Sequence, residues 1–200
     1  MKKINPKNNR DVKKKKSIMS TTKWALDNAH SEIQFKVRHF MVSWAHGHFT
    51  KFNAEVSSDG DDFTTAKVRF SADVDSINTH NEQRDAHLKN GDFFDVDNHP
   101  QITFESESLE KVSDEEFKLH GLLTIRGTTR KVTLRVEYGG IMQDPWGNTR
   151  TGFTITGKIN RKDFGVSFGG VTETGNVLLS DDVTITANVE FVKVTELQPA

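Results

Sequence analysis

Apolar and polar residues alternate along most of the chain with a period of two, which is the pattern of β-strands that bury one face. The clearest runs are residues 66–74, 132–138 and 183–191, in which every second side chain is apolar. Shorter runs of the same kind surround Ile33, Phe49, Ile102, Leu119 and Phe153. Together these runs predict an all-β fold of about eight antiparallel strands.

Short turn signals separate the runs, for example at residues 58–60, 126–128 and 144–147. Short connections favour pairing between strands that are neighbours in sequence, so the chain predicts an up-and-down β-barrel or a strongly curled sheet. A barrel of about eight strands has an interior that its own side chains can fill, or that can hold one slender ligand.

One segment, residues 79–91, interrupts the strands with a helical pattern. Thr79-His80-Asn81-Glu82 matches a capping box with Thr79 as the N-cap, and Asn90-Gly91 supplies a stop signal. The sequence therefore predicts a helix of about ten residues.

On this helix, Arg84, His87 and Leu88 share one face, and Asp85 and Lys89 are spaced to form a surface ion pair. Three apolar residues on the helix and just after it could anchor this segment to the barrel: Leu88, Phe93 and Phe94. We expect the helix to pack as a lid or side wall against the barrel.

The charge is distributed unevenly. Residues 1–20 hold eight Lys or Arg and one Asp, a net charge of +7, which leaves −8 for the rest of a chain whose total is −1. Such a basic run has little to bury, so we expect residues 1–20 to form a disordered basic tail and residues 21–200 a single barrel domain. The acidic body argues against a nucleic-acid partner.

Two features are absent from the sequence. The chain has no cysteine, which excludes disulfides and thiolate metal sites. No apolar run long enough for a signal peptide or a transmembrane segment is visible, so we expect a soluble, cytoplasmic protein. An exposed edge strand would allow a homodimer.

Two motifs are of the kinds found in catalytic or metal-binding sites. Residues 165–169 read Gly-x-Ser-x-Gly, like the nucleophile elbow of an esterase, but no histidine follows His120 to complete a triad. His46 and His48 would project from one face of a strand and could begin a metal site. A third ligand could come from His30, His39 or Glu55. A metal protein or enzyme that uses the His46/His48 face is thus the alternative function.

A third motif, Arg84-Asp85-x-His87-Leu88, is echoed by Arg161-Lys162-Asp163. Arginine beside aspartate favours an ion pair that anchors the helix. The competing interpretation is a cationic rim, formed by Arg84, His87 and Arg161, for a phosphate or another polar head group.

These residues belong to a longer set over which the sequence resembles the YceI-like family, covering about residues 23–194. The resemblance rests on these motifs, in chain order: Trp24-x-x-Asp27-x-x-His30-Ser31, Phe35-x-Val37-x-His39, Gly47-x-Phe49, Ser76-Ile77-x-Thr79, Arg84-Asp85-x-His87-Leu88, Asp92-Phe93-Phe94-Asp95, Pro100-x-Ile102-Thr103-Phe104, Gly121-x-Leu123-Thr124-Ile125-x-Gly127-x-Thr129, Arg150-x-Gly152-Phe153, Asn160-Arg161-x-Asp163-Phe164-Gly165 and Asp182-Val183-x-Ile185.

The resemblance implies a lipocalin-like eight-stranded antiparallel barrel with one short helical insertion, an apolar tunnel for a long polyisoprenoid lipid, no catalytic activity and no cofactor. An isoprenoid quinone or a polyprenyl phosphate, held for transport or storage, is the expected ligand. The abundance of Phe, 14 residues against a single Tyr, suits such a lumen because phenyl rings leave no polar atom to satisfy. Its predicted lining is Phe35, Val37, Phe70, Phe104, Leu123, Phe153, Ile155 and Ile185.

Overall fold

The computed structural model of the chain describes residues 21–169 and 178–194; the predicted basic tail of residues 1–20 lies outside this part. The strands are β1 (Thr21–Leu26), β2 (Glu32–His39), β3 (Ser43–Phe49), β4 (Phe52–Asp59), β5 (Asp62–Asp73), β6 (Ile77–Asn78), β7 (Gln101–Lys111), β8 (Glu116–Ile125), β9 (Thr128–Gln143), β10 (Thr149–Asn160) and β11 (Leu179–Lys193). The helical elements are η1 (Asn28–His30), η2 (Val74–Ser76), α1 (Glu82–Lys89) and η3 (Arg161–Phe164).

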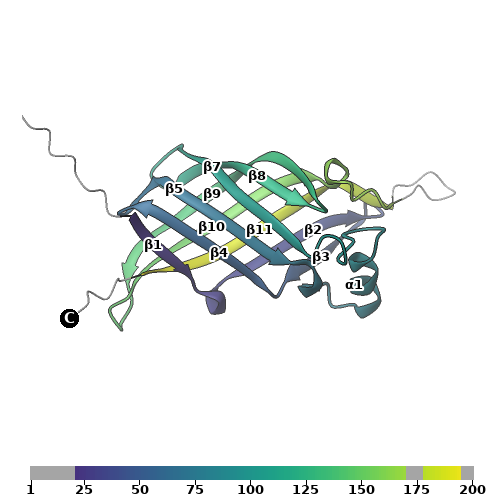
Figure 1. Ribbon diagram of the computed structural model, residues 1–200, viewed down its shortest axis with the longest axis horizontal. Helices are drawn as coiled ribbons and strands as arrows, with labels where there is room; N and C mark the ends of the chain where they lie inside the picture. The colour runs from purple at the N-terminus through teal and green to yellow at the C-terminus, as the bar shows by residue number, and fades with distance from the viewer. Residues whose placement is uncertain (1–20, 170–177, 195–200) are drawn as a thin grey trace, which may run out of the picture.

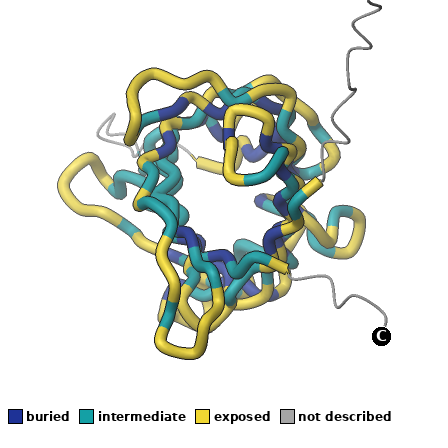
Figure 2. Tube along the Cα trace, turned by 90° about the vertical axis from the view of Figure 1, so that its left-hand side faces the viewer, coloured by how far each residue is buried: buried dark blue, intermediate teal, exposed yellow. Residues whose placement is uncertain are grey.

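Eight of the strands close into a ring. β1, β4, β5, β7, β8, β9, β10 and β11 pair in this order, and β11 pairs again with β1. All of these pairings are antiparallel, and the strands surround the barrel axis when the molecule is viewed end-on (Figure 2). The predicted eight-stranded antiparallel barrel is therefore confirmed.

The three remaining strands lengthen the barrel at one end. β2 pairs with β11, β3 with β2, and β6 with β3. Each continues the path of a ring strand across a bend: β2 follows β1 after η1, β4 follows β3 after two residues, and β6 follows β5 after η2. The runs predicted from the sequence did not resolve these bends: one run around Phe49 covers both β3 and β4, and no run covers β1 or β6. The buried positions change parity at a bend, from Phe49 in β3 to Ala54 in β4.

Helix α1 lies at this lengthened end, beside β3 (Figure 1), and we call this the α1 end. Leu88, Phe93 and Phe94 pack against the barrel core, as predicted. Within the described residues no helix is both long and apolar enough to cross a bilayer.

The predicted capping of α1 is wrong in two details. Its N-cap is Asn81, whose side chain accepts the backbone N–H of Arg84 at 2.9 Å. Thr79 instead donates its hydroxyl to the Asp85 carboxylate, which also accepts the Thr79 backbone N–H at 2.9 Å. Because Asp85 is engaged there, Lys89 does not pair with it and instead forms an ion pair with Asp75 at 2.9 Å.

The opposite end of the barrel is filled by an aromatic plug made of Trp24, Phe63, Phe117, Tyr138, Phe153 and Phe191. Neighbouring ring centroids lie between 5.0 and 6.3 Å apart, in tilted, edge-to-face and stacked arrangements. The Trp24 indole N–H donates to the Ser58 hydroxyl at 2.9 Å, so its one polar atom is satisfied inside the plug.

The ring closes along the seam between β1 and β11, and Arg150 of β10 holds this seam together. Its guanidinium bridges Asp27, which follows β1, Glu190 on β11, and Asp144 in the β9–β10 turn. Asp27 also caps η1 by accepting the Ala29 N–H, and its own N–H donates to the Glu190 carbonyl. One cation thus joins three segments that are far apart in the sequence.

These contacts shift the titration of the carboxylates. The hydrogen bonds from Arg150 and then from His30 lower the pKa of Asp27 from 3.8 to about 2. Although burial acts in the opposite direction, hydrogen bonds from Arg150 and Asn148 hold the pKa of Asp144 well below its usual range. Because both folded-state pKa values are depressed, the stabilisation is complete above the unfolded pKa and is lost as the pH falls through the folded values.

We predict that Arg150→Met lowers the thermal unfolding midpoint by about 5 °C at neutral pH, because it leaves three carboxylates facing one another. The difference from the unsubstituted protein should be constant above about pH 5 and should shrink as the pH falls towards 2. Differential scanning calorimetry over this range measures it. Arg69→Met, which removes an exposed pair with Glu105, is the matched control and should change the midpoint little.

Candidate functional site

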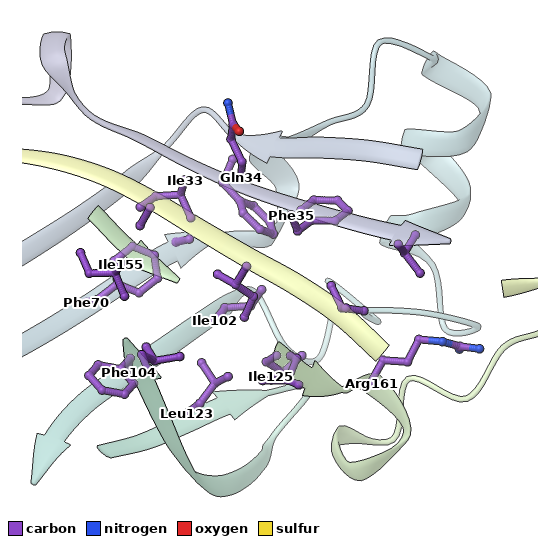
Figure 3. Close-up of a pocket in the computed structure, with 18 of the residues that line it drawn as sticks. Ile33, Gln34, Phe35, Phe70, Ile102, Phe104, Leu123, Ile125, Ile155 and Arg161 are labelled. Carbon is purple, nitrogen blue, oxygen red and sulfur yellow. The ribbon is translucent and has the colours of Figure 1, made fainter. Parts of the chain in front are cut away.

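The barrel encloses a cavity of about 730 Å³ that runs from the aromatic plug towards the α1 end. Its wall is built by alternate side chains of the strands, because one face of each strand points into the barrel. Figure 3 shows apolar side chains from several strands gathered around one space, with Arg161 at one end and Gln34 pointing away.

The eight apolar residues predicted for the lumen all line this cavity: Phe35, Val37, Phe70, Phe104, Leu123, Phe153, Ile155 and Ile185. The period-two pattern placed them correctly because it fixes which face of a strand is buried, whatever the final pairing of the strands. Whether they contact a ligand stays a prediction.

The interior is hollow and is not packed by its own side chains. Ile155, Val183 and Ile185 face inward from β10 and β11 and yet are only half-buried. Core residues of a filled barrel are close-packed and lose nearly all of their exposed surface. The half-buried wall therefore marks unfilled apolar space that a ligand of matching shape could occupy.

The cavity opens at the α1 end, which we call the mouth. Exposed residues of its wall gather there, on the β2–β3 hairpin, around α1 and after η3: Ser43, Trp44, His46, His80, Arg84 and Phe168. Gln34, on the outer side of β2, is the other exposed residue of the wall within the described part of the chain. The arrangement is a blind apolar tube with a polar rim.

At the rim, Arg84 serves chiefly as an anchor. Its Nε donates to the Thr79 hydroxyl and its Nη2 to the Thr79 carbonyl, each at 2.7 Å. Thr79 is buried and also bonds Asp85. Arg84 and Asp85 thus tie α1 to the residue that follows β6 through their separate bonds with Thr79, and not through the ion pair between them that the sequence favoured. The Nη1 group of Arg84 makes no hydrogen bond within the described residues and remains available at the mouth.

Arg161 is buried and grips the loop that follows η3. It donates from Nη1 to the carbonyls of Val166 and Phe168 and from Nε to the carbonyl of Ser180. Burial lowers the pKa of Arg161, and the Asp181 carboxylate, 3.6 Å from Nη2, acts in the opposite direction. These contacts make Arg161 part of the wall, with most of its donors used by the backbone.

His87 lies one turn after Arg84 on α1 and contacts the loop that Arg161 holds. Its Nε2 is 2.9 Å from a carboxylate oxygen of Asp92, and its ring contacts Phe93 and Phe168 edge-on with centroid separations of 5.0 and 4.8 Å. The structure thus brings the three predicted rim residues Arg84, His87 and Arg161 into the wall of one cavity.

The serine motif at residues 165–169 does not form a nucleophile elbow. An elbow needs a strand before the serine and a helix after it. Here Ser167 follows the η3 helix and a turn at Gly165, and residues 166–169 form neither strand nor helix.

The predicted histidine pair lies on β3, on either side of Gly47, which faces the interior against Phe35. The His48 ring lies near that of His80, with centroids 5.5 Å apart and the two planes tilted by 43°. Within residues 21–169 and 178–194, one group of three side chains lies close enough together to bind a metal, and it consists of Asp27, His30 and Glu190. The histidine pair is not part of it, and the Arg150 guanidinium already supplies the cation for its two carboxylates.

Several residues of the cavity wall were not predicted from the sequence. Val183 and Ala187 share the inward face of β11 with Ile185, so the same alternation could have found them. Phe168 has no such signal, because it lies outside any strand and reaches the mouth only through the loop held by Arg161.

If Arg161 is a structural clamp, Arg161→Gln should lower the free energy of unfolding by about 3 kcal/mol, because one buried and two partly buried carbonyls lose a charged donor. Urea denaturation measures this loss. Lys162→Gln, which removes an exposed pair with Asp181, is the control and should change stability little. Unchanged stability of Arg161→Gln would contradict the clamp and favour a direct ligand contact.

Comparison with known proteins agrees with this architecture. The chain matches the YceI-like domain family over residues 24–191. A UPF0312 protein of Staphylococcus aureus (strain N315) is 43% identical over 171 residues, which cover 85% of this chain and 97% of the relative.

Among solved structures, the YCEI protein of Campylobacter jejuni is 34% identical, with a TM-score of 0.69 over 86% of this chain and 97% of that one. BcnA of Burkholderia cenocepacia is 25% identical, with a TM-score of 0.71 over 82% and 98%. A polyisoprenoid binding domain from Saccharophagus degradans, at 12% identity and a TM-score of 0.64 over 86% and 98%, shares the fold. On the family match and these similarities, the chain belongs to the YceI-like domain family.

Proposed function

We propose that this protein is a non-catalytic carrier that binds one long polyisoprenoid lipid in its barrel. The observation that carries the proposal is the blind apolar cavity, whose wall is half-buried although it faces inward. The fold shared with a polyisoprenoid binding domain of Saccharophagus degradans supports the same ligand class.

The length of the cavity fits an extended chain. Wall residues of β11 run from Leu179 to Phe191, which is about 40 Å along the strand and about 30 Å along the axis at the usual tilt of barrel strands. The burial of one five-carbon unit contributes about 3–4 kcal/mol before the losses from association and chain ordering. Affinity should therefore rise with chain length until the tube is full.

The polar rim fixes the direction of the chain. An apolar tail placed against the aromatic plug leaves its head group at the mouth, near Arg84 and His87. The Nη1 group of Arg84 is the donor best placed for a phosphate or quinone oxygen. Most N–H groups of Arg161 already donate to backbone carbonyls, including that of Val166 after η3. We propose the eight predicted wall residues as tail contacts. A cytoplasmic location stays a prediction from the sequence.

Native mass spectrometry, with solvent extraction and identification of bound lipid, tests the proposal. We expect a prenyl quinone or prenyl phosphate to copurify. Protein stripped of lipid should take up prenols from detergent micelles with an affinity that rises about tenfold per isoprene unit until the cavity is full. Uptake that does not depend on chain length would contradict the proposal.

The sharpest variant fills the lumen. Ile185→Trp places a large side chain in the middle of the cavity and should abolish prenol uptake, whereas Thr186→Trp adds the same side chain on the outer face of β11 and should not. Gly121 also faces inward but is a poorer position, because a Cβ there would lie 2.4 Å from the Glu105 carbonyl oxygen. Thermal unfolding of both variants verifies that they fold.

A further inference from the structure

The β2–β3 hairpin at the mouth exposes an unusual run of apolar side chains. Val42 is 81% exposed, Met41 56%, and Phe40 and Trp44 41% each. Phe168, also at the mouth, is 37% exposed. Single exposed apolar residues are common on protein surfaces, whereas a contiguous exposed apolar patch marks a binding surface.

The conformation of the turn strengthens this argument. Phe40 and Met41 have φ angles of 48° and 59°, and the Val42 N–H donates to the His39 carbonyl at 3.1 Å. Residues 39–42 form a β-turn within the three-residue connection between β2 and β3, and both of its central positions have positive φ, which favours Asn and Gly. Two bulky apolar residues occupy a strained turn and contribute little to the core, so their presence there points to a role outside the fold.

The charges beside the turn indicate what it contacts. Lys36 and Arg38, on the outer face of β2, lie over the Trp44 ring at 5.0 and 4.3 Å from its centroid. Neither forms a salt bridge within residues 21–169 and 178–194. Apolar side chains at a tip, a tryptophan behind them and unpaired cations beside it are the arrangement that binds an anionic membrane surface.

We propose that the hairpin tip docks the mouth of the cavity onto the surface of an anionic lipid bilayer. Phe40, Met41 and Val42 enter the boundary between head groups and acyl chains, while Lys36 and Arg38 contact lipid phosphates. Ser43, Trp44 and Ala45 of the same hairpin line the cavity, so docking brings the opening of the tube against the membrane. The purpose of docking, loading and release of a prenyl chain, rests on the proposed function.

A second exposed apolar turn provides the matched control. Met142 and Trp146, in and after β9, are 67% and 81% exposed but belong to the β9–β10 connection at the plugged end. The β9–β10 connection lies at the other end of the barrel from α1 (Figure 1), so these residues match the hairpin in exposure but not in position.

The test compares the full-length protein with the double variant Phe40→Asn/Met41→Gly. Asn-Gly is the preferred sequence for this turn, so we expect the variant to fold at least as stably as the unsubstituted protein. Its binding to vesicles of phosphatidylcholine and phosphatidylglycerol, measured by co-sedimentation, should fall about tenfold or more, because two inserting side chains are lost. Met142→Ser/Trp146→Ser should bind as the unsubstituted protein does.

A second readout locates the contact. In a Trp146→Phe background, brominated acyl chains should quench Trp44, since Trp24 is only 2% exposed inside the plug. Every variant retains residues 1–20, so any attraction of these lysines to the vesicles is common to all of them. The inference would be overturned if Phe40→Asn/Met41→Gly bound vesicles as well as the unsubstituted protein does, or if Trp44 were not quenched. The exposed apolar residues of the β2–β3 hairpin would then be assigned to a protein partner.

The result is separable from the proposed function. Prenol uptake from detergent micelles should be unchanged in Phe40→Asn/Met41→Gly, whereas uptake from prenol-containing vesicles should slow. If the unsubstituted protein binds vesicles but takes up no prenol from micelles, the proposed function fails and the docking inference stands.

Discussion

The closure of the sheet depends on one guanidinium. β1 contributes only a short ladder to β11, from Trp24 to Leu26, and the chain then turns away through η1. Arg150 holds the turned segment to β11 and to the β9–β10 connection through three carboxylates. Without a closed ring the sheet would have two edges and no enclosed cavity. The apolar lumen therefore depends on the ionic cluster around Arg150.

The hollow interior is the second constraint. A core with unfilled space gives up dispersion contacts that a packed core of the same residues would make. The aromatic plug concentrates close packing at one end, where ring stacks and the Trp24–Ser58 hydrogen bond stabilise the barrel. The rest of the lumen is thereby free to stay open. The protein separates the part of its interior that maintains the fold from the part that can receive a ligand.

The alternation of apolar and polar residues predicted an up-and-down barrel or a strongly curled sheet, and the inward face of the strands that it detected, since side-chain direction follows directly from position along a strand. The closed eight-stranded barrel was implied by the resemblance to the YceI-like family. The alternation did not resolve the bend between β3 and β4, where the buried positions shift from Phe49 to Ala54 within one predicted run, and it gave no signal for the six-residue β1. Thr79 shows a different limit. Its local pattern matches a helix cap, but the buried hydrogen bonds with Asp85 and Arg84 decide its role. The hydrogen bonds of Arg161 could not be predicted from the sequence either, because they go to backbone carbonyls, whose positions no side-chain pattern indicates.

The aromatic plug has a consequence for exchange. A tube with one opening is narrow enough that two chains cannot pass one another, and nothing can push a resident chain out from behind. Replacement must therefore proceed through the empty protein: the resident leaves first, and the newcomer enters afterwards. The rate of exchange is then set by departure alone and does not change with the concentration of the incoming chain, a kinetic order that distinguishes a blind tube from a channel open at both ends.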